Sequence, residues 1–232
     1  NLLVLKDNKI KKSQFKHIGD YLPKGTLLVF NETKVIRARL QFHKATGSRI
    51  EIFCLEPEKD YQVAFSATSP VRWKCLIGNS KRWKEGLLSM ELTVGGGPVV
   101  LNAERIFQND QYAEIEFSWT PATLPFASVL EAAGEIPLPP YLHRDAEPDD
   151  RDRYQTVFAR YDGSVAAPTA GLHFTQPLIA KLLEQGFNFD EVTLHVGAGP
   201  FRPVATETIG EHAMHSETIV VRKSLIQNLI RS

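Results

Sequence analysis

Residues 35–56 read VIRARLQFHKATGSRIEIFCLE, and this stretch decides which kind of fold the chain can adopt. Apolar and polar side chains alternate along its first part, in the order Ile36, Arg37, Ala38, Arg39, Leu40, Gln41, Phe42 and His43. This alternation is the period of a β-strand with one buried face. The segment ATGS at 45–48 is a turn signal, and SRIEIFCLE begins a second strand. The stretch therefore predicts two neighbouring strands, the first of which has a basic outer face.

Further short strands are predicted on the C-terminal side of this stretch. Their sequences are YQVAFSA at 61–67, VRWKCLI at 71–77, LLSMELTV at 87–94, VVLNAERIF at 99–107 and YAEIEFSW at 112–119. Turn signals separate several of them, namely GNS, GGGP and QND. Many short strands at this spacing favour a small barrel or sandwich. We expect residues 37–119 to form a closed or nearly closed antiparallel β-barrel.

The flanking segments have the pattern of an α/β fold. TPATLPFASVLEAAG at 120–134 and TQPLIAKLLEQG at 175–186 each carry a threonine cap candidate, a first-turn proline and a closing glycine. FNFDEVTLHVGAG at 187–199 predicts a strand that enters a glycine-rich loop. Near the N-terminus we expect a hairpin around KDNK, a short helix over 13–21 and a strand TLLVF. We expect LLVL and TLLVF to belong to the same sheet as the strand at 187–199, which makes the barrel an insertion. The predicted fold is an α/β domain of residues 1–36 and 120–232 with an inserted β-barrel domain at 37–119.

Charge is distributed unevenly along the chain, although the formal net charge is zero. Residues 1–84 carry 17 Lys and Arg against 7 Asp and Glu, while the remaining residues carry 10 against 20. One interpretation is that a polyanion docks on the basic half. The other is that the two halves attract each other, and both remain open at this point.

Cysteine content and hydropathy indicate a cytoplasmic protein. The two cysteines, Cys54 and Cys75, are too few for a disulfide framework and fit a reducing compartment as half-buried thiols. The apolar run at the N-terminus is too short for a signal peptide, and no uninterrupted apolar run could span a bilayer. We therefore expect no membrane association.

Two loops are candidates for ligand binding, GSVAAPTAGLHFT at 163–175 and TLHVGAGPFRPV at 193–204. Small residues allow backbone amides to approach a ligand closely, and the helix that follows Thr175 offers unsatisfied N–H groups. Tight packing of a helix on a sheet also requires small residues, so these loops alone leave both interpretations open.

Six motifs together resemble one family. They are LPKGTLLVFNETKVIRARL, PLPPYL, DRDRYQTVFAR, GSVAAPTAGLHFT, TLHVGAGPFRPV and MHSE, and the resemblance runs from the first residues to about Glu217. In order and spacing they resemble the S-adenosylmethionine:tRNA ribosyltransferase-isomerases of queuosine biosynthesis. The resemblance implies an α/β domain that carries a β-barrel, in agreement with the pattern above.

The resemblance also implies a reaction and its partners. The ribosyl part of S-adenosylmethionine would move onto 7-aminomethyl-7-deazaguanine at the wobble position of tRNA, giving epoxyqueuosine and releasing adenine and methionine. S-adenosylmethionine would be the co-substrate, tRNA carrying the precursor base the partner, and no metal is implied. The alternative from another functional class is a non-catalytic RNA-binding paralogue that keeps the basic barrel.

The chain departs from the family pattern at several places. Arg37 stands where members usually have proline, and Pro200 where they usually have threonine. Members also begin earlier than Asn1 and extend beyond Ser232, so we expect the chain to be truncated at its C-terminus.

The sulfonium acidifies the adjacent ribose methylene, so the reaction requires a general base, a general acid and a pocket for adenine. Histidine titrates in the useful range. The candidate catalytic residues are His173, His195, His215 and Glu217. The candidate substrate-binding residues are Pro168, Thr169, Ala170, Gly171, Phe174, Gly197, Gly199, Phe201 and Ser216. We expect residues 168–174, 195–201 and 215–217 to converge on one cleft.

Basic residues of the predicted barrel are candidates for tRNA binding, namely Arg37, Arg39, His43, Arg72, Lys74, Lys81 and Arg82. Trp73 and Trp83 lie among them and could stack on an unpaired base, although we expect at least one of them in the core. HAMH at 212–215 has a spacing that a zinc site could use, but no glutamate lies between the histidines, and we expect no metal.

Overall fold

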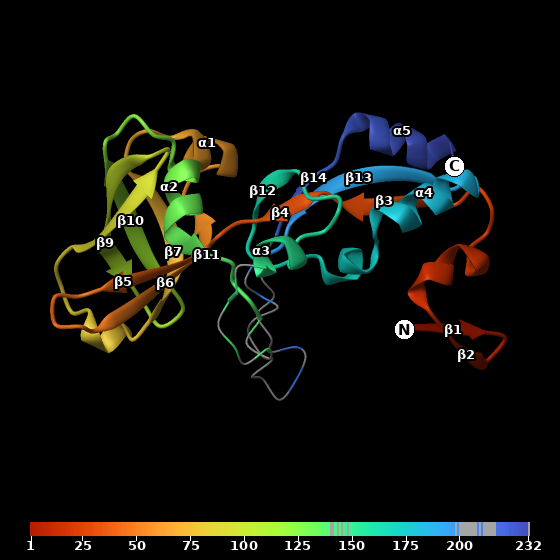
Figure 1. Cartoon of the computed structure of the whole chain (residues 1–232), viewed down its shortest axis with the longest axis horizontal. Coiled ribbons are helices and arrows are strands. Elements are labelled where there is room, and N and C mark those ends of the chain that lie inside the picture. The colour runs from red at the N-terminus through yellow and green to blue at the C-terminus, as the bar shows by residue number, and fades with distance from the viewer. Residues whose placement is uncertain are drawn as a thin grey trace.

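The structure is a computed structural model, and it describes residues 1–139, 142, 144, 146–147, 149–197, 199, 208, 210 and 217–231. Figure 1 shows a curled sheet with two helices, α1 and α2, on one side of the view, and smaller sheets with α4 and α5 on the other. A hairpin at the N-terminus lies apart from both groups in this view (Figure 1).

The curled sheet has seven antiparallel strands, in the order β11-β5-β6-β7-β10-β9-β8. Their bounds are β5 Arg39–His43, β6 Arg49–Pro57, β7 Val71–Gly78, β8 Leu88–Val94, β9 Gly97–Gln108, β10 Ala113–Thr120 and β11 Gly134–Glu135. β5 and β8 approach each other as the sheet curls. The predicted barrel is thus confirmed as a curled antiparallel sheet, but no ladder among the described residues joins its two edges, and β11 lies beyond residue 119.

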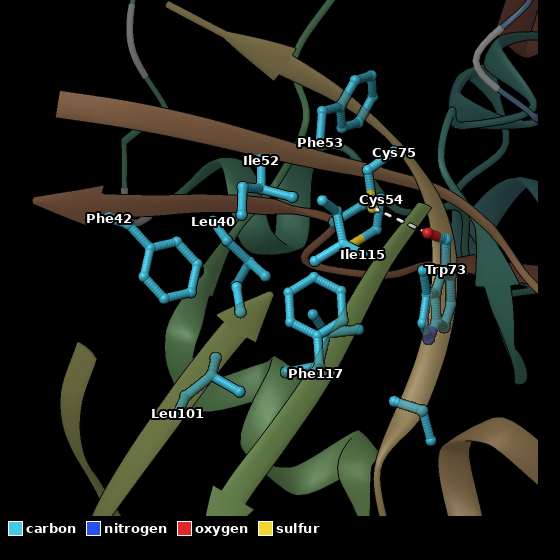
Figure 2. Close-up of a cluster of buried hydrophobic side chains, with 14 of the residues drawn as sticks. Leu40, Phe42, Ile52, Phe53, Cys54, Trp73, Cys75, Leu101, Ile115 and Phe117 are labelled. Atoms are coloured by element: carbon cyan, nitrogen blue, oxygen red, sulfur yellow. Dashed lines mark hydrogen bonds between the residues drawn. The ribbon is translucent and has the colours of Figure 1, made fainter. Parts of the chain in front are cut away.

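The alternating residues of the opening stretch form the core of this sheet. Leu40 and Phe42 from β5 and Ile52 from β6 are fully buried and face Ile115 and Phe117 of β10 (Figure 2). The helix α2 (Phe126–Ala133) packs onto the same core. The ring centroid of Phe126 lies 6.0 Å from that of Trp73, 5.7 Å from that of Phe117 and 5.4 Å from that of Trp119.

The two cysteines are fully buried rather than half-buried. Cys54 and Cys75 lie directly opposite each other on β6 and β7, and both are free thiols. The Cys75 thiol donates a hydrogen bond of 3.6 Å to the backbone oxygen of Trp73 (Figure 2). Burial raises the pKa of Cys75 well above its ordinary value, so it remains a protonated, unreactive core thiol.

Two predictions of local structure in this region are wrong. Residues 61–67, predicted as a strand, contain the helix α1 (Tyr61–Ser66), because the carboxylate of Asp60 accepts a hydrogen bond of 2.8 Å from the N–H of Gln62 and caps its first turn. The helix predicted within residues 120–134 has no threonine cap, because it begins at Phe126 after Pro125, although it ends at the predicted Gly134.

Parallel strand pairs make up the other group of elements. β3 (Leu27–Asn31) pairs in parallel with β13 (Asn188–His195), and β14 (Thr218–Val220) pairs antiparallel with β13 on its other side. β4 (Thr33–Val35) pairs in parallel with β12 (Tyr161–Ser164). These pairs confirm that the second group is a mixed α/β arrangement rather than part of the antiparallel sheet.

Helices cover this group, and one of them begins as predicted. In α4 (Gln176–Glu184) the hydroxyl of Thr175 accepts a hydrogen bond from the N–H of Leu178. α5 (Lys223–Arg231) lies along β13, where the amide of Asn228 donates a hydrogen bond of 2.8 Å to Asp190. Other short helices are η2 (Ser80–Arg82), α3 (Asp150–Arg153) and η4 (Thr169–His173). In the part of the chain that the structure describes, no helix is long and apolar enough to cross a membrane.

The N-terminal segment forms the predicted hairpin. β1 (Leu2–Lys6) pairs with β2 (Lys9–Ser13), and Asp7 and Asn8 adopt the positive φ angles that a two-residue turn requires. η1 (Phe15–Tyr21) is the predicted short helix. The expectation that TLLVF shares a sheet with the strand at 187–199 is confirmed by the ladder between β3 and β13. The expectation that LLVL joins this sheet is wrong, because β1 is hydrogen-bonded to β2 in a separate sheet.

Candidate active-site cavity

The last residues of β13 bring polar side chains to one face of the strand. Phe189, Glu191, Thr193 and His195 alternate with the residues that face α5. The ladders on both sides of β13 hold this register, since β3 pairs with its first half and β14 with its end at Thr193–His195. Thr193 and His195 therefore share a face, as the sequence predicts.

A cavity of about 640 Å³ lies beside this face. It lies between the helices on the curled sheet and the end of the parallel sheets. It is lined by Asp60, Tyr61, Gln62, Phe65, Ser66, Ala127, Arg160, Tyr161, Asp162, Thr193, His195, Thr218, Val220 and Arg222. Its volume falls in the range of small-molecule sites.

His195 is the ionisable group best placed in this cavity to act as a base. Its Nδ1 shares a hydrogen bond of 2.8 Å with the hydroxyl of Thr33, and its ring centroid lies 4.9 Å from that of Tyr61. Burial lowers the pKa of His195, and the carboxylates of Asp60 and Asp162 oppose this effect. The lowered pKa keeps the imidazole neutral near pH 7, which is the form that accepts a proton.

Tyr61 lines the cavity beside His195, and Glu217 directly precedes the lining residue Thr218. Burial, followed by the charges of Glu56, Cys54 and Glu217, raises the pKa of Tyr61, so its phenol stays protonated. The Glu217 carboxylate accepts a hydrogen bond of 3.1 Å from the N–H of Gly197. His195 and Glu217, both predicted as catalytic, are thus brought to neighbouring positions where β13 meets β14.

A buried carboxylate organises the opposite end. Glu32 is fully buried, and its Oε1 accepts hydrogen bonds from the Thr193 hydroxyl at 3.0 Å and from the Arg222 guanidinium. Arg160 lies 3.7 Å from Glu32 Oε2, and both arginines also pair with Glu191, at 3.2 Å from Arg160 and 3.8 Å from Arg222. Two carboxylates and two guanidiniums therefore form a neutral network beside the cavity.

Gly163 is required next to His195, because a Cβ there would lie 2.6 Å from Cε1 and Nδ1 of the imidazole. Its φ of +151° is also nearly inaccessible to other residues. We expect Gly163→Ala to displace His195 and to lower the free energy of unfolding by about 1–3 kcal/mol. Urea denaturation measures this change.

The control for this substitution is Gly97→Ala in β9. A Cβ at Gly97 would make only an ordinary contact, 3.7 Å from the backbone oxygen of Val94. We expect Gly97→Ala to change the free energy of unfolding by less than about 0.5 kcal/mol. Equal effects of the two substitutions would contradict the proposed steric role of Gly163.

Residues 168–174 lie in a different environment from His195. His173 packs on Phe15 with ring centroids 5.1 Å apart, and Phe174 contacts Phe15 and Phe30 at 5.0 and 4.8 Å. Gly171 faces the methyl group of Thr156. Pro168, Thr169 and Ala170 form the start of the η4 turn. None of these residues lines the cavity beside His195, and their role in substrate binding stays a prediction.

Several predicted site residues lie outside the described residues, namely Phe201, His215 and Ser216, as does His212 of the HAMH segment. Gly199 is described and half-buried. The predicted convergence of the three segments on one cleft therefore stays a prediction. Over the described ranges no three His, Cys, Asp or Glu side chains gather in a metal-binding arrangement.

The basic face of the curled sheet is largely occupied by internal ion pairs. The pairs are Arg37–Glu131 at 3.3 Å, Arg39–Glu51 at 3.7 Å, Arg72–Glu116 at 2.8 Å and Lys74–Glu56 at 2.6 Å. The pairs of Arg37 and Arg72 join the basic half of the sequence to the acidic half. Part of the charge asymmetry therefore serves internal attraction, the second interpretation offered above.

Other candidates on this sheet remain accessible. His43, Lys81 and Arg82 are exposed, and among the described residues none of the three has a carboxylate partner. Trp73 and Trp83 are both fully buried, so neither indole can stack on a base. The assignment of tRNA contacts stays a prediction.

The sequence analysis missed several residues of this cavity. Glu32, Thr33 and Arg160 lie inside the quoted motifs NETKVIRARL and DRDRYQTVFAR, but no local pattern distinguished them from structural residues. Tyr61 was assigned to a strand, and Arg222 lies beyond the last motif. A charged residue directly after an apolar strand, as Glu32 is after TLLVFN, is the signal that could have directed attention there, because a buried carboxylate needs partners.

The chain matches the family described as "Queuosine biosynthesis protein" over residues 1–232. It is 43% identical over 216 residues to the S-adenosylmethionine:tRNA ribosyltransferase-isomerase of Pelobacter propionicus, covering 93% of this chain and 58% of that protein. It is 40% identical over 218 residues to the enzyme of the same name from Trichlorobacter lovleyi, covering 93% and 59%. The chain thus spans less than two thirds of these relatives.

A solved structure is also similar, that of an S-adenosylmethionine tRNA ribosyltransferase from Thermotoga maritima. Its sequence identity is 24%, and the match covers 96% of this chain and 53% of that one. The TM-score is 0.29, so the likeness bears on no detail of the fold.

Proposed function

Because the chain belongs to the queuosine biosynthesis protein family, we propose that it carries the catalytic site of an S-adenosylmethionine:tRNA ribosyltransferase-isomerase. The proposed reaction moves the ribosyl moiety of S-adenosylmethionine onto 7-aminomethyl-7-deazaguanine at the tRNA wobble position. The products are epoxyqueuosine in tRNA, adenine and methionine. The substrates are S-adenosylmethionine and tRNA that carries the precursor base, and no metal takes part.

One observation supports this proposal above the others: a cavity of small-molecule size holds a histidine of lowered pKa beside a protonated phenol. His195 is the proposed base that removes the proton from the ribose methylene next to the sulfonium. Tyr61 is in the protonated form that an acid needs when adenine departs. Glu217 lies close enough to raise the pKa of Tyr61 and so favours that form.

The non-catalytic alternative has no observation in its favour. Both relatives described above are named for a catalytic activity. The basic face that an RNA-binding module would use is largely paired with glutamates, whereas the cavity contains groups suited to proton transfer.

We further propose that residues 37–119 are a domain inserted between residues 1–36 and 120–232. The parallel ladder of β4 and β12 supports this division, because it places the chain just before and well after the curled sheet side by side. α2 then packs on the inserted sheet from the segment that follows it. A cytoplasmic location remains our expectation for an enzyme that acts on tRNA.

For tRNA binding we propose the exposed residues His43, Lys81 and Arg82 as primary contacts. Arg37, Arg39, Arg72 and Lys74 belong to the same surface. A phosphate that binds one of these four must first compete with its glutamate partner, which reduces its net contribution.

The test of the proposed activity is the release of adenine. The chain is incubated with S-adenosylmethionine and tRNA that carries 7-aminomethyl-7-deazaguanine, and adenine and methionine are measured by liquid chromatography. We expect equal amounts of both, together with a mass increase of the modified nucleoside. A salt-sensitive complex with tRNA and no adenine would instead identify a binding module.

A further inference from the structure

The cavity has two chemically different ends. Arg160 and Arg222, which pair with Glu191, lie at one end, and His195, whose ring contacts that of Tyr61, lies at the other. On β13, Glu191 marks the arginine end and His195 the opposite one. Because four residues of a strand span about 13 Å, the two ends can bind separate parts of one ligand.

The arginine end is built to hold two guanidiniums in fixed positions. Glu32 is fully buried and Glu191 half-buried, and each contacts both Arg160 and Arg222. The guanidinium of Arg222 also lies over the ring of Tyr161, 5.8 Å from its centroid. These contacts restrain both side chains on one side, so part of the cost of orienting their other donors is met before a ligand binds.

Donors for a ligand remain on Arg160. A guanidinium has five N–H groups, and the side-chain contacts of Arg160 to Glu32 and Glu191 use only Nη1. Its side chain is 59% exposed at the cavity. Within the part of the chain that the structure describes, Nε and Nη2 of Arg160 thus remain available for a planar anion such as a carboxylate.

The other end suits a cation. The carboxylates of Asp60 and Asp162 both act electrostatically on His195, and the rings of Tyr61 and Phe65 line the same cavity. Asp162 also pairs with Lys34 at 3.1 Å, so Asp60 is the carboxylate of this end without a basic side-chain partner among the described residues. Carboxylates and aromatic rings stabilise a nearby positive charge. A ligand with an anionic group at one end and a cationic centre further along would match this distribution.

We infer that Arg160 and Arg222 bind the methionine carboxylate of S-adenosylmethionine and so direct its sulfonium and adjacent ribose methylene toward Tyr61 and His195. This inference rests on the proposed function, because it assumes that S-adenosylmethionine is the substrate. It assigns the amino-acid end of that substrate to residues outside the glycine-rich loops.

Decarboxylated S-adenosylmethionine tests this inference, since it keeps the sulfonium, the amine and the adenosine but lacks the carboxylate. Dissociation constants of both compounds are measured by isothermal titration calorimetry. We expect the wild-type chain to bind S-adenosylmethionine about 10–100-fold more tightly than the decarboxylated compound. We expect Arg160→Gln to reduce this preference to about threefold or less. The main cause should be weaker binding of S-adenosylmethionine, with little change in the binding of the decarboxylated compound.

Two further variants separate recognition from folding. Arg222→Lys keeps the charge and the pairing with Glu32 but loses the planar fork, and we expect a partial loss of the preference. Arg151→Gln is the matched control, because Arg151 pairs with Glu131 at 2.7 Å and does not line the cavity. It should keep the full preference. Thermal melting followed by circular dichroism checks that each variant is folded.

Four results would overturn the inference. In the first, the wild-type chain binds both compounds equally. In the second, Arg160→Gln weakens the binding of both compounds equally, which identifies a structural role for Arg160. In the third, Arg160→Gln weakens tRNA binding and keeps the ligand preference, which assigns the arginines to a phosphate of RNA. These three leave the proposed activity intact, whereas in the fourth the wild-type chain binds no S-adenosylmethionine, and the proposed function fails as well.

Discussion

His195→Gln is expected to slow adenine release by about 10²–10⁴-fold, the usual contribution of a general base. Glutamine is similar in size and can still share a hydrogen bond with Thr33, but it cannot accept a proton at neutral pH. The affinity for S-adenosylmethionine should change little. Single-turnover assays with saturating substrate measure the rate.

The pH dependence of the wild-type rate provides a second check on His195. Because burial lowers its pKa, the neutral form is already populated below the ordinary value of about 6.5. The rate should therefore rise with pH through a step below 6.5 and then reach a plateau. His195→Gln should abolish this step.

His17→Gln is the control histidine variant. His17 lies in η1, is 43% exposed and pairs with Asp20, away from the cavity lining. We expect its rate to equal that of the wild type. A His195→Gln variant that keeps more than a tenth of the wild-type rate would show that another residue is the base.

Phe126→Ala is expected to destabilise the protein by about 3–5 kcal/mol, the cost of removing a large buried aromatic ring. Phe126 is fully buried and holds α2 against Trp73, Phe117 and Trp119. Since the core cannot collapse fully into the space left by the ring, a cavity adds to the lost burial. The midpoint of urea denaturation should fall accordingly.

Leu183→Ala in α4 provides the comparison for a surface position. Leu183 is 55% exposed, and we expect a change of about 0.5 kcal/mol or less. If Phe126→Ala proves as mild as Leu183→Ala, α2 does not form part of the core of the curled sheet.

The curled sheet was largely predictable because each strand carries a local signal. Leu40 and Phe42 alternate with polar residues and are fully buried in the structure. Alternation of apolar and polar residues gave a wrong prediction at Tyr61, Val63 and Phe65, which alternate like a strand but belong to the helix α1. There the capping carboxylate of Asp60 determined the outcome, and six residues are too few for periodicity to distinguish a helix from a strand.

The candidate site was less predictable, because its residues come from segments far apart in the sequence. His195 could be placed on a polar strand face, but its neighbours Thr33 and Tyr61 arrive from β4 and α1. Glu32 forms an ion pair with Arg222, which lies 190 residues later in the sequence. Only the folded topology brings these groups together, and no spacing rule within a single segment anticipates it.

The parallel pairing of β3 with β13 also has a consequence for biosynthesis. The last strand of the curled sheet ends at Glu135. Every strand of this sheet has therefore been translated once the ribosome has passed residue 135. In contrast, the backbone of β3 can pair with β13 only after residues 188–192 have been translated. At about 5–20 residues per second, this delay on the ribosome is roughly 10–30 seconds.

During that interval the nascent chain exposes an apolar strand without a partner. Leu28 and Phe30 belong to β3 and pack against elements that follow much later, including Phe189 on β13 and Phe174 before α4. An unpaired apolar strand is a template for association with other chains. The region around the buried Glu32 therefore becomes native only after residues 188–192 have been translated, and the yield of folded chain depends on how well residues 27–31 are shielded until then.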